Sequence, residues 1–192
     1  MKQTIHLIAI SGSLRAASCN TALLRAVEAL APSQIKVTLF EQLAQVPPFN
    51  PDIEVDSVPL LAQLRDQIIA ADGVLIASPE YAHGVSGVMK NLLDWLVNTP
   101  AFVNKPVATL NASPRAQHAF AALKETLTMM SAQWLEAASI TVPVMGETTS
   151  TETILRNPLL CTDLRKALAV FAELQLEAKS ECRVIGQMSW HP

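Results

Sequence analysis

The strongest constraint on the fold is a regular alternation between short apolar runs and segments with helical periodicity. The five runs are Ile5–Ile10, Ile35–Phe40, Gly73–Ser78, Pro106–Leu110 and a stretch around Ser139–Val144. They are not polar at alternate positions, which is typical of strands that are buried on both faces. Helical stripes of apolar residues lie between and after them: Leu23/Ala26/Val27/Leu30, Leu61/Leu64/Ile68, Val85/Val88/Met89/Leu92/Leu96, Phe120/Leu123/Leu127/Met130 and Leu164/Ala167/Leu168/Phe171. This order predicts an open parallel α/β sheet with helices on both faces.

Composition narrows the class of protein further. The 192 residues suit one domain, and 50% of them are hydrophobic, which excludes disorder as the main state. The net charge is −3 without a run of Lys or Arg, so we expect no nucleic-acid partner. No apolar run approaches the roughly 20 residues of a membrane span, and no signal peptide is recognised at the N-terminus. Cys19, Cys161 and Cys182 are odd in number and lack metal-like spacing, so we expect no disulfide framework, no metal site and a cytoplasmic location.

The segment after the first run combines small residues with groups that bind anions. It reads Ser11-Gly12-Ser13-Leu14-Arg15-Ala16-Ala17-Ser18-Cys19-Asn20 and leads into the first helical stripe. Backbone N–H groups in such a turn can converge on an anion, and a helix N-terminus adds partial positive charge. The pattern predicts a phosphate site, with simple helix capping by Ser18 as the alternative. Neither the nucleoside-triphosphate loop G-x-x-x-x-G-K-[ST] nor the dinucleotide fingerprint G-x-G-x-x-G is present.

A second candidate segment follows the third run. It reads Ser78-Pro79-Glu80-Tyr81-Ala82-His83-Gly84-Val85-Ser86-Gly87. Pro79 ends the strand, and the rings of Tyr81 and His83 fall at the carboxyl edge of the predicted sheet, where ligands of such folds bind. Gly84 and Gly87 allow close backbone approach. The segment predicts a platform for a flat heterocycle; the alternative is an ordinary strand–turn–helix with Tyr81 on the surface.

Together the two segments resemble the NADPH-dependent FMN reductase family, which includes chromate and quinone reductases and azoreductase-like proteins. The resemblance rests on Gly12-Ser13-Leu14-Arg15-x-x-Ser18-x-Asn20 and on Pro79-Glu80-Tyr81-x-x-Gly84-x-x-Gly87-x-x-Lys90-Asn91-x-x-Asp94-Trp95. It implies a flavodoxin-like three-layer sandwich, with a five-stranded parallel sheet of order 2-1-3-4-5 and helices on both faces. We expect an FMN-binding domain over residues 1–179 and a C-terminal tail over 180–192.

The resemblance also implies a cofactor and its ligands. FMN would be bound, with its phosphate held by the first segment: Ser11, Ser13, Leu14, Arg15, Ser18 and Asn20. The flavin ring would be lined largely by backbone groups of Pro79, Glu80, Tyr81, Ala82, His83 and Gly84, and its pyrimidine edge closed by the loop Asn111–Arg115, including Ser113. Tyr81 and Arg115 would shape the substrate pocket, and either Arg15 or Arg115 could meet the 2′-phosphate of NADPH. Many relatives have a glycine-rich loop where this chain has none (Asn111–Phe120), which predicts a stiffer and bulkier loop.

The implied activity is that of an NAD(P)H-dependent FMN-containing reductase. Hydride would pass from NADPH or NADH through flavin N5 to a small-molecule electron acceptor, such as a quinone, an azo compound, free flavin or a metal oxyanion like chromate. No catalytic side chain is expected, because the flavin carries the chemistry. A homodimer or homotetramer is implied, with the helix of Lys90, Asn91, Asp94 and Trp95 at a subunit interface. The alternatives are a flavodoxin-type electron carrier, which is usually more acidic, and a flavin-free α/β regulatory module.

Overall fold

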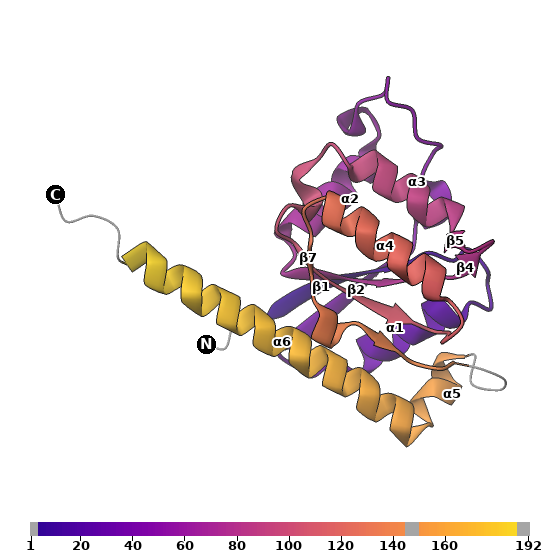
Figure 1. Ribbon diagram of the computed structural model, residues 1–192, viewed down its shortest axis with the longest axis vertical. Coiled ribbons are helices and arrows are strands. Elements are labelled where there is room, and N and C mark those ends of the chain that lie inside the picture. The colour runs from indigo at the N-terminus through magenta and orange to yellow at the C-terminus, as the bar shows by residue number, and fades with distance from the viewer. Residues whose placement is uncertain (1–3, 145–149, 188–192) are drawn as a thin grey trace.

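A computed structural model describes residues 4–144 and 150–187, with side chains described as far as Gln175. It confirms the parallel α/β architecture (Figure 1). The strands are β1 (Ile5–Ser11), β2 (Ile35–Phe40), β3 (Gly73–Ala77), β4 (Glu80–Tyr81), β5 (Gly84–Val85), β6 (Pro106–Asn111), β7 (Gln133–Trp134) and β8 (Ile140–Thr141). The α-helices are α1 (Cys19–Leu30), α2 (Pro59–Ala70), α3 (Gly87–Leu96), α4 (Gln117–Met129), α5 (Thr151–Leu155) and α6 (Pro158–Gln187). Short 3₁₀ turns lie at Leu43–Gln45, Val55–Ser57, Pro100–Phe102 and Glu136–Ala138.

The main sheet has the order β2-β1-β3-β6-β7, and all its pairings are parallel. The expected order 2-1-3-4-5 is therefore found, but the fifth position is divided. Sequence analysis placed one strand around Ser139–Val144, whereas two short strands, β7 and β8, pair with successive parts of β6. The 3₁₀ turn Glu136–Ala138 separates them and interrupts what would otherwise be one strand.

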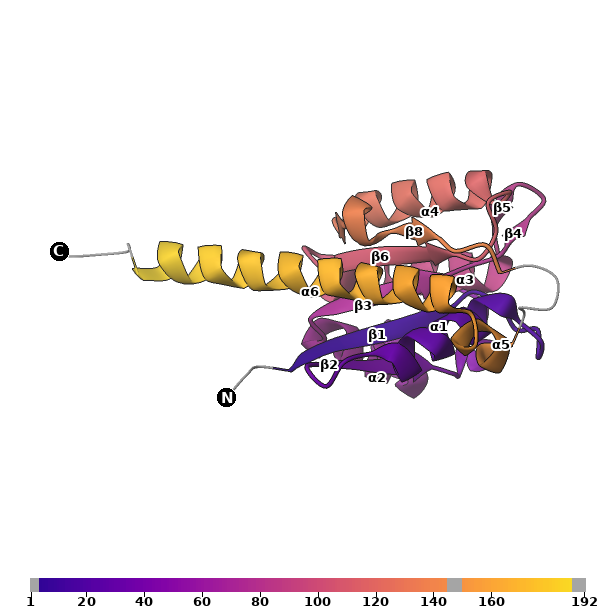
Figure 2. The ribbon, with the colours of Figure 1, turned by 90° about the horizontal axis from the view of Figure 1, so that it is seen from below.

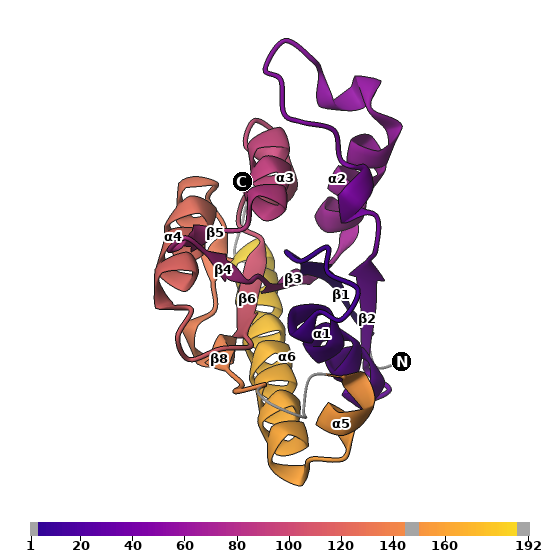
Figure 3. The same ribbon diagram turned by 90° about the vertical axis from the view of Figure 1, so that its right-hand side faces the viewer.

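The sheet is buried on both faces because its side chains alternate between two cores. Ile5, Leu7 and Ala9 of β1 face a core that also includes apolar residues of α1 and α6. Ile8 and Ile10, which point the other way, join a core with residues of α2, α3 and α4. Figure 3 shows α1 and α6 on one side of the sheet and α2 and α3 on the other. This arrangement explains why the runs are apolar throughout.

The last helix is the longest element of the structure. Its N-terminal part packs on the sheet, where the ring of Phe171 leaves no room for a side chain at Gly73; a Cβ there would lie 2.3 Å from Phe171 Cζ. Its C-terminal part extends past the sheet (Figure 2). The helix is continuous through residue 180, where we expected a tail to begin, and residues 188–192 of that tail lie outside the described residues. Within the described ranges, no helix is long and apolar enough to cross a membrane.

The order of the strands fixes one edge of the sheet as the place for a ligand. The chain passes from β1 outward to β2 and then returns to β3 on the other side of β1, so the crossovers diverge between β1 and β3. In open α/β sheets, ligands bind beyond the carboxyl ends of the strands at such a switch point. The β1–α1 loop, the segment after β3 and the loop after β6 all emerge at this edge.

Candidate functional site

The β1–α1 loop presents backbone donors around the start of α1. Ser18 is the N-cap, and its Oγ accepts a hydrogen bond from Thr21 N at 3.2 Å. Within the described residues, the N–H groups of Ala17, Ser18, Cys19 and Asn20 donate to no other group of the chain. A helix N-terminus with free N–H groups is a general anion-binding arrangement. Ser18 therefore caps α1, and the N–H groups named above stay available to an anion.

The β1–α1 loop is held against the segment after β3 by very close packing. A Cβ on Gly12 would lie 2.4 Å from Ser78 Oγ and 2.8 Å from Ser78 Cβ, so only glycine fits at this position. The buried hydroxyl of Ser86, the N-cap of α3, donates to the carbonyl oxygen of Gly12 at 2.6 Å. Ser86 therefore joins the two candidate segments. Sequence reasoning missed this role, although a serine directly before a helical stripe is a recognisable cap signal.

The residues expected to line a flat ligand form a strained hairpin. β4 and β5 pair antiparallel, and the two residues between them, Ala82 and His83, have φ values of 49° and 59°. Positive φ at both central residues is typical of a type I′ turn, which favours Asn-Gly because other side chains are strained there. The turn therefore places its left-handed conformation on Ala82 and His83 and not on Gly84. Such strain often accompanies functional sites.

The loop after β6 is braced by Asn111 in place of glycines. The buried Asn111 Oδ1 accepts from Ser113 N at 3.1 Å, and its Nδ2 donates to Ala116 O at 3.5 Å. Ser113 Oγ in turn accepts from Arg115 N at 3.3 Å. The predicted stiffness of this loop thus has a concrete source, and Asn111 is a site residue whose role sequence reasoning did not identify.

Parts of all three segments enclose a cavity of about 380 Å³ at the switch point. It brings together five expected site residues, Asn20, Pro79, Glu80, Ser113 and Arg115, with Cys19, Ser78, Asn111, Ala112 and Ala116. Asn20 is 5% exposed, and within the described residues its Oδ1 has no hydrogen-bond partner. A buried acceptor without a partner costs free energy unless a ligand or water supplies a donor. The cavity therefore has the volume of a small-ligand site, and one of its lining residues has an unmet polar group.

The other expected residues lie next to this cavity but do not line it. Ser11, Ser13, Leu14 and Arg15 line a second cavity, of about 360 Å³, that reaches the end of β2. There the guanidinium of Arg25 is paired with Glu41 at 2.9 Å, whereas Arg15 makes no ion pair with any described residue. Tyr81, Ala82 and His83 are exposed on the hairpin and, like Gly84, line neither cavity.

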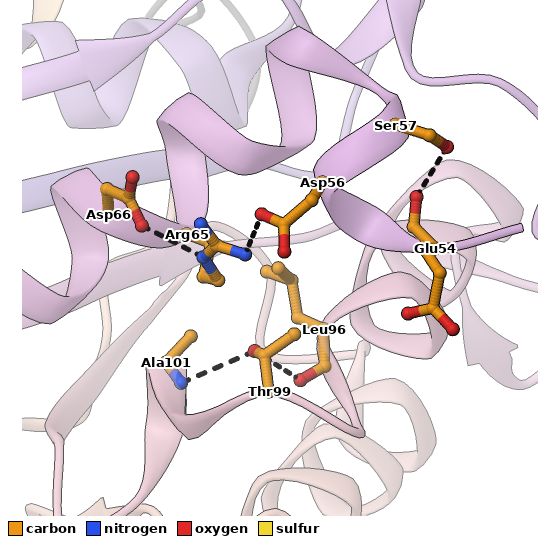
Figure 4. Close-up of polar contacts among 8 residues, drawn as sticks. All are labelled: Glu54, Asp56, Ser57, Arg65, Asp66, Leu96, Thr99 and Ala101. Carbon is orange, nitrogen blue, oxygen red and sulfur yellow. Dashed lines mark hydrogen bonds and ion pairs between the residues drawn. The ribbon is translucent and has the colours of Figure 1, made fainter.

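A larger cavity lies elsewhere. It measures about 600 Å³ and lies between the segment before α2, α2 itself and the end of α3. Its cation, Arg65, is already bonded to two carboxylates, with Asp66 at 2.9 Å and Asp56 on its other side (Figure 4). Its inner wall is Trp95, which donates from Nε1 to Pro47 O at 2.8 Å and packs edge-on against Phe49. Asn91 also bonds Phe49 and Pro47, so these two helix residues are engaged within the chain.

Fold and site together define a class of protein, namely a flavodoxin-like α/β domain with a cavity at its switch point. The profile of the family described as NADPH-dependent FMN reductase matches residues 5–149, and the chain belongs to this family. It is 38% identical over 116 residues to an NAD(P)H-dependent FMN reductase of Pseudomonas aeruginosa, covering 59% of this chain and 62% of that protein. It is 37% identical over 116 residues to an NADPH:quinone oxidoreductase of Arabidopsis thaliana, covering 58% and 59%.

A solved structure supports the same fold. The flavoenzyme NAD(P)H:(acceptor) oxidoreductase FerB of Paracoccus denitrificans superposes with a TM-score of 0.70 at 24% identity, covering 88% of this chain and 98% of that one. The matches to the two curated relatives span about three-fifths of their lengths.

Proposed function

We propose that the chain is an NAD(P)H-dependent FMN-containing reductase that passes electrons to small-molecule acceptors. The observation that carries the proposal is the cavity at the switch point, lined by Cys19 and Asn20 at the start of α1, where N–H groups and the buried Asn20 Oδ1 have no hydrogen-bond partner among the described residues. The family membership and the two relatives named as reductases support it.

The residues present fit FMN. The free N–H groups before and at the start of α1 suit a phosphate monoester, and the Arg15 side chain is available to add a full positive charge. The amide of Asn20, which lines the cavity, can form a hydrogen bond with a polar group of the sugar chain. Pro79, Glu80 and the braced loop from Asn111 offer two walls for a flat ring.

The remaining roles concern binding and access. When bound, FMN supplies the redox chemistry by accepting hydride from a reduced nicotinamide and passing it to the acceptor. Tyr81 is 58% exposed on the hairpin beside the cavity, where its ring can contact a planar acceptor. Arg115 lines the cavity, is exposed and makes no ion pair with a described residue, so it is available for an anionic group of either substrate.

The name of the Arabidopsis relative, an NADPH:quinone oxidoreductase, supports quinones as the acceptor class. Azo compounds, free flavin and chromate remain predictions from the family resemblance, as do a homodimeric or homotetrameric state and a cytoplasmic location. Because Asn91 and Trp95 hold the loop around Pro47, a subunit contact on α3 would use its exposed residues, such as Lys90. A preference for NADPH over NADH would come from a contact of its 2′-phosphate with Arg15 or with Arg115.

Absorbance of the purified protein tests this proposal. After FMN is added and the excess removed, we expect visible flavin bands that bleach when NADPH or NADH is added without oxygen and return when a quinone follows. Riboflavin, which lacks the phosphate, is the matched ligand control and should be retained far less. Protein that holds no FMN contradicts the proposal, and bands that neither nucleotide bleaches identify an electron carrier instead.

A further inference from the structure

Helix α4 begins without a cap of its own. Its N-cap position is Ala116, whose side chain cannot accept a hydrogen bond, and its first turn contains no acidic residue. The first N–H groups of a helix need acceptors from elsewhere, and negative charge is favourable near them. The acceptor at this helix comes from a residue far away in the sequence.

That residue is Glu80 of β4. Its Oε2 accepts a hydrogen bond from Ala119 N at 2.9 Å, across a sequence separation of 39 residues. Glu80 also lines the cavity at the switch point, together with Ala116 from the start of the α4 segment. The Glu80 carboxylate therefore joins two parts of the structure. One is the hairpin, on one wall of the cavity, and the other is α4, which comes directly after the loop on the opposite wall.

The hairpin depends on such a tether because it is weak by itself. Each of its strands has only two residues, and both residues of its turn are in the strained left-handed conformation. An isolated two-stranded hairpin is marginally stable at best. A second contact lies at the tip, where the rings of His83 and His118 stack with centroids 4.3 Å apart.

We propose that the Glu80 side chain is a positioning residue that sets the width of the flavin cleft by fixing the β4–β5 hairpin to the N-terminus of α4. This inference rests on the proposed function, since it assigns FMN to the cavity. Because the carboxylate is bonded to the helix, Glu80 acts on the ring through the placement of its own backbone and that of its neighbours. Without the tether, the hairpin wall moves away from the loop that Asn111 braces.

The test compares Glu80→Ala and Glu80→Gln with Glu125→Gln, which removes the same charge from the exposed face of the same helix. FMN affinity of each apoprotein is measured by fluorescence quenching, together with the visible circular dichroism of the bound flavin and the unfolding midpoint. We expect Glu80→Ala to weaken FMN binding about 10-fold and to change the flavin dichroism. Glu80→Gln keeps an acceptor oxygen at the same reach and should stay within about 3-fold of the parent, while Glu125→Gln should match it.

Stability separates positioning from a merely structural role. If Glu80→Ala lowers the unfolding midpoint but binds FMN with the parent's affinity and dichroism, the positioning role is wrong. Failure of Glu80→Gln to restore binding would also overturn it, because the tether requires only an acceptor. If the parent protein itself binds no FMN, the proposed function fails first and the inference falls with it.

Discussion

Two cavities of this protein differ in their hydrogen-bonding capacity, and the difference supports the proposed site. The larger one, beside Trp95, has about 600 Å³, and its arginine is already paired with carboxylates of the same chain. The smaller one, at the switch point, has about 380 Å³ and is lined by Asn20 and Arg115. Among the described residues, the Asn20 Oδ1 has no hydrogen-bond partner, Arg115 makes no ion pair, and N–H groups at the start of α1 donate to no other group. Unmet hydrogen-bonding capacity, and not volume, therefore distinguishes the proposed ligand site. The larger cavity is a feature of how the segment before α2 packs.

The largest expected effect lies in the larger cavity and concerns stability. Trp95 is 1% exposed, and Trp95→Ala should cost about 3–5 kcal/mol of unfolding free energy, measured by urea denaturation. Trp95→Phe keeps a ring and loses the bond to Pro47, so it should cost less and remain folded. We expect Trp95→Phe to bind FMN as tightly as the parent. Loss of FMN by this folded variant would show that the two cavities are not independent.

Two arginine variants, one at each site, test the same comparison through FMN affinity. Arg15→Ala should weaken FMN binding by about 1.5–3 kcal/mol, the worth of a charge-assisted hydrogen bond, as measured by fluorescence titration. Arg65→Ala removes the same charge from the larger cavity and should leave FMN affinity unchanged. If the effects are reversed, the phosphate site is misplaced.

The close approach of two loops at the smaller site can be tested by adding one methyl group. Gly12→Ala should cost about 1–3 kcal/mol of stability through its clash with Ser78 and should also weaken FMN binding. Ser78→Gly removes both clashing side-chain atoms, so the double variant should recover part of the loss. Additive effects in the double variant would mean that the two residues do not limit each other.

The sequence predicts the sheet and the loops that meet at its edge, but it does not predict how the fifth strand is divided. Apolar runs and helical stripes predict the sheet because burial on both faces leaves a direct mark on each strand. The order of the chemical segments, from Ser11 to Asn20 and from Pro79 to Gly84, predicts which loops meet. The division of the fifth strand left no such mark, because strands of two residues are too short to show periodicity.

The side-chain tethers were not predictable because they join distant positions. Nothing near Ala116 indicates that Glu80 caps α4, and nothing near Pro47 indicates that Asn91 and Trp95 hold it. The strained turn was equally hidden, since Ala82 and His83 are unusual residues for positive φ and the nearby Gly84 suggests a different turn. Which cavity each arginine enters likewise depends on side-chain direction.

Strain marks the hairpin beside the smaller cavity, where Ala82 and His83 have positive φ, although no described non-glycine residue that lines either cavity does. Ala82→Gly should relieve strain in the hairpin and raise the unfolding free energy by about 1 kcal/mol. Ala122→Gly, on the exposed face of α4, should lower it by about 1 kcal/mol. Thermal unfolding of the two variants checks the opposite signs, and equal losses would refute strain at Ala82.

The smallest expected effect concerns the ion pair between Lys124 and Glu136, which lies outside both cavities. A hydrogen bond from Lys124 lowers the pKa of Glu136 below its usual value of 4.5. Because the folded pKa is depressed, the stabilisation is present above pH 4.5 and is lost as the pH falls through the folded pKa. Lys124→Met should reduce the slope of stability against pH in that acidic range, as followed by urea unfolding. An unchanged slope would show that the pair contributes nothing measurable, as many exposed pairs do.

Hydrogen exchange with and without saturating FMN tests the central claim most directly. We predict that FMN protects amides in residues 12–20, 78–84 and 111–119, which surround the smaller cavity, and leaves residues 49–58 and 98–100 of the larger cavity unchanged. Protection of the larger cavity alone, or no protection at either cavity, would contradict the assignment of the cofactor to the switch point.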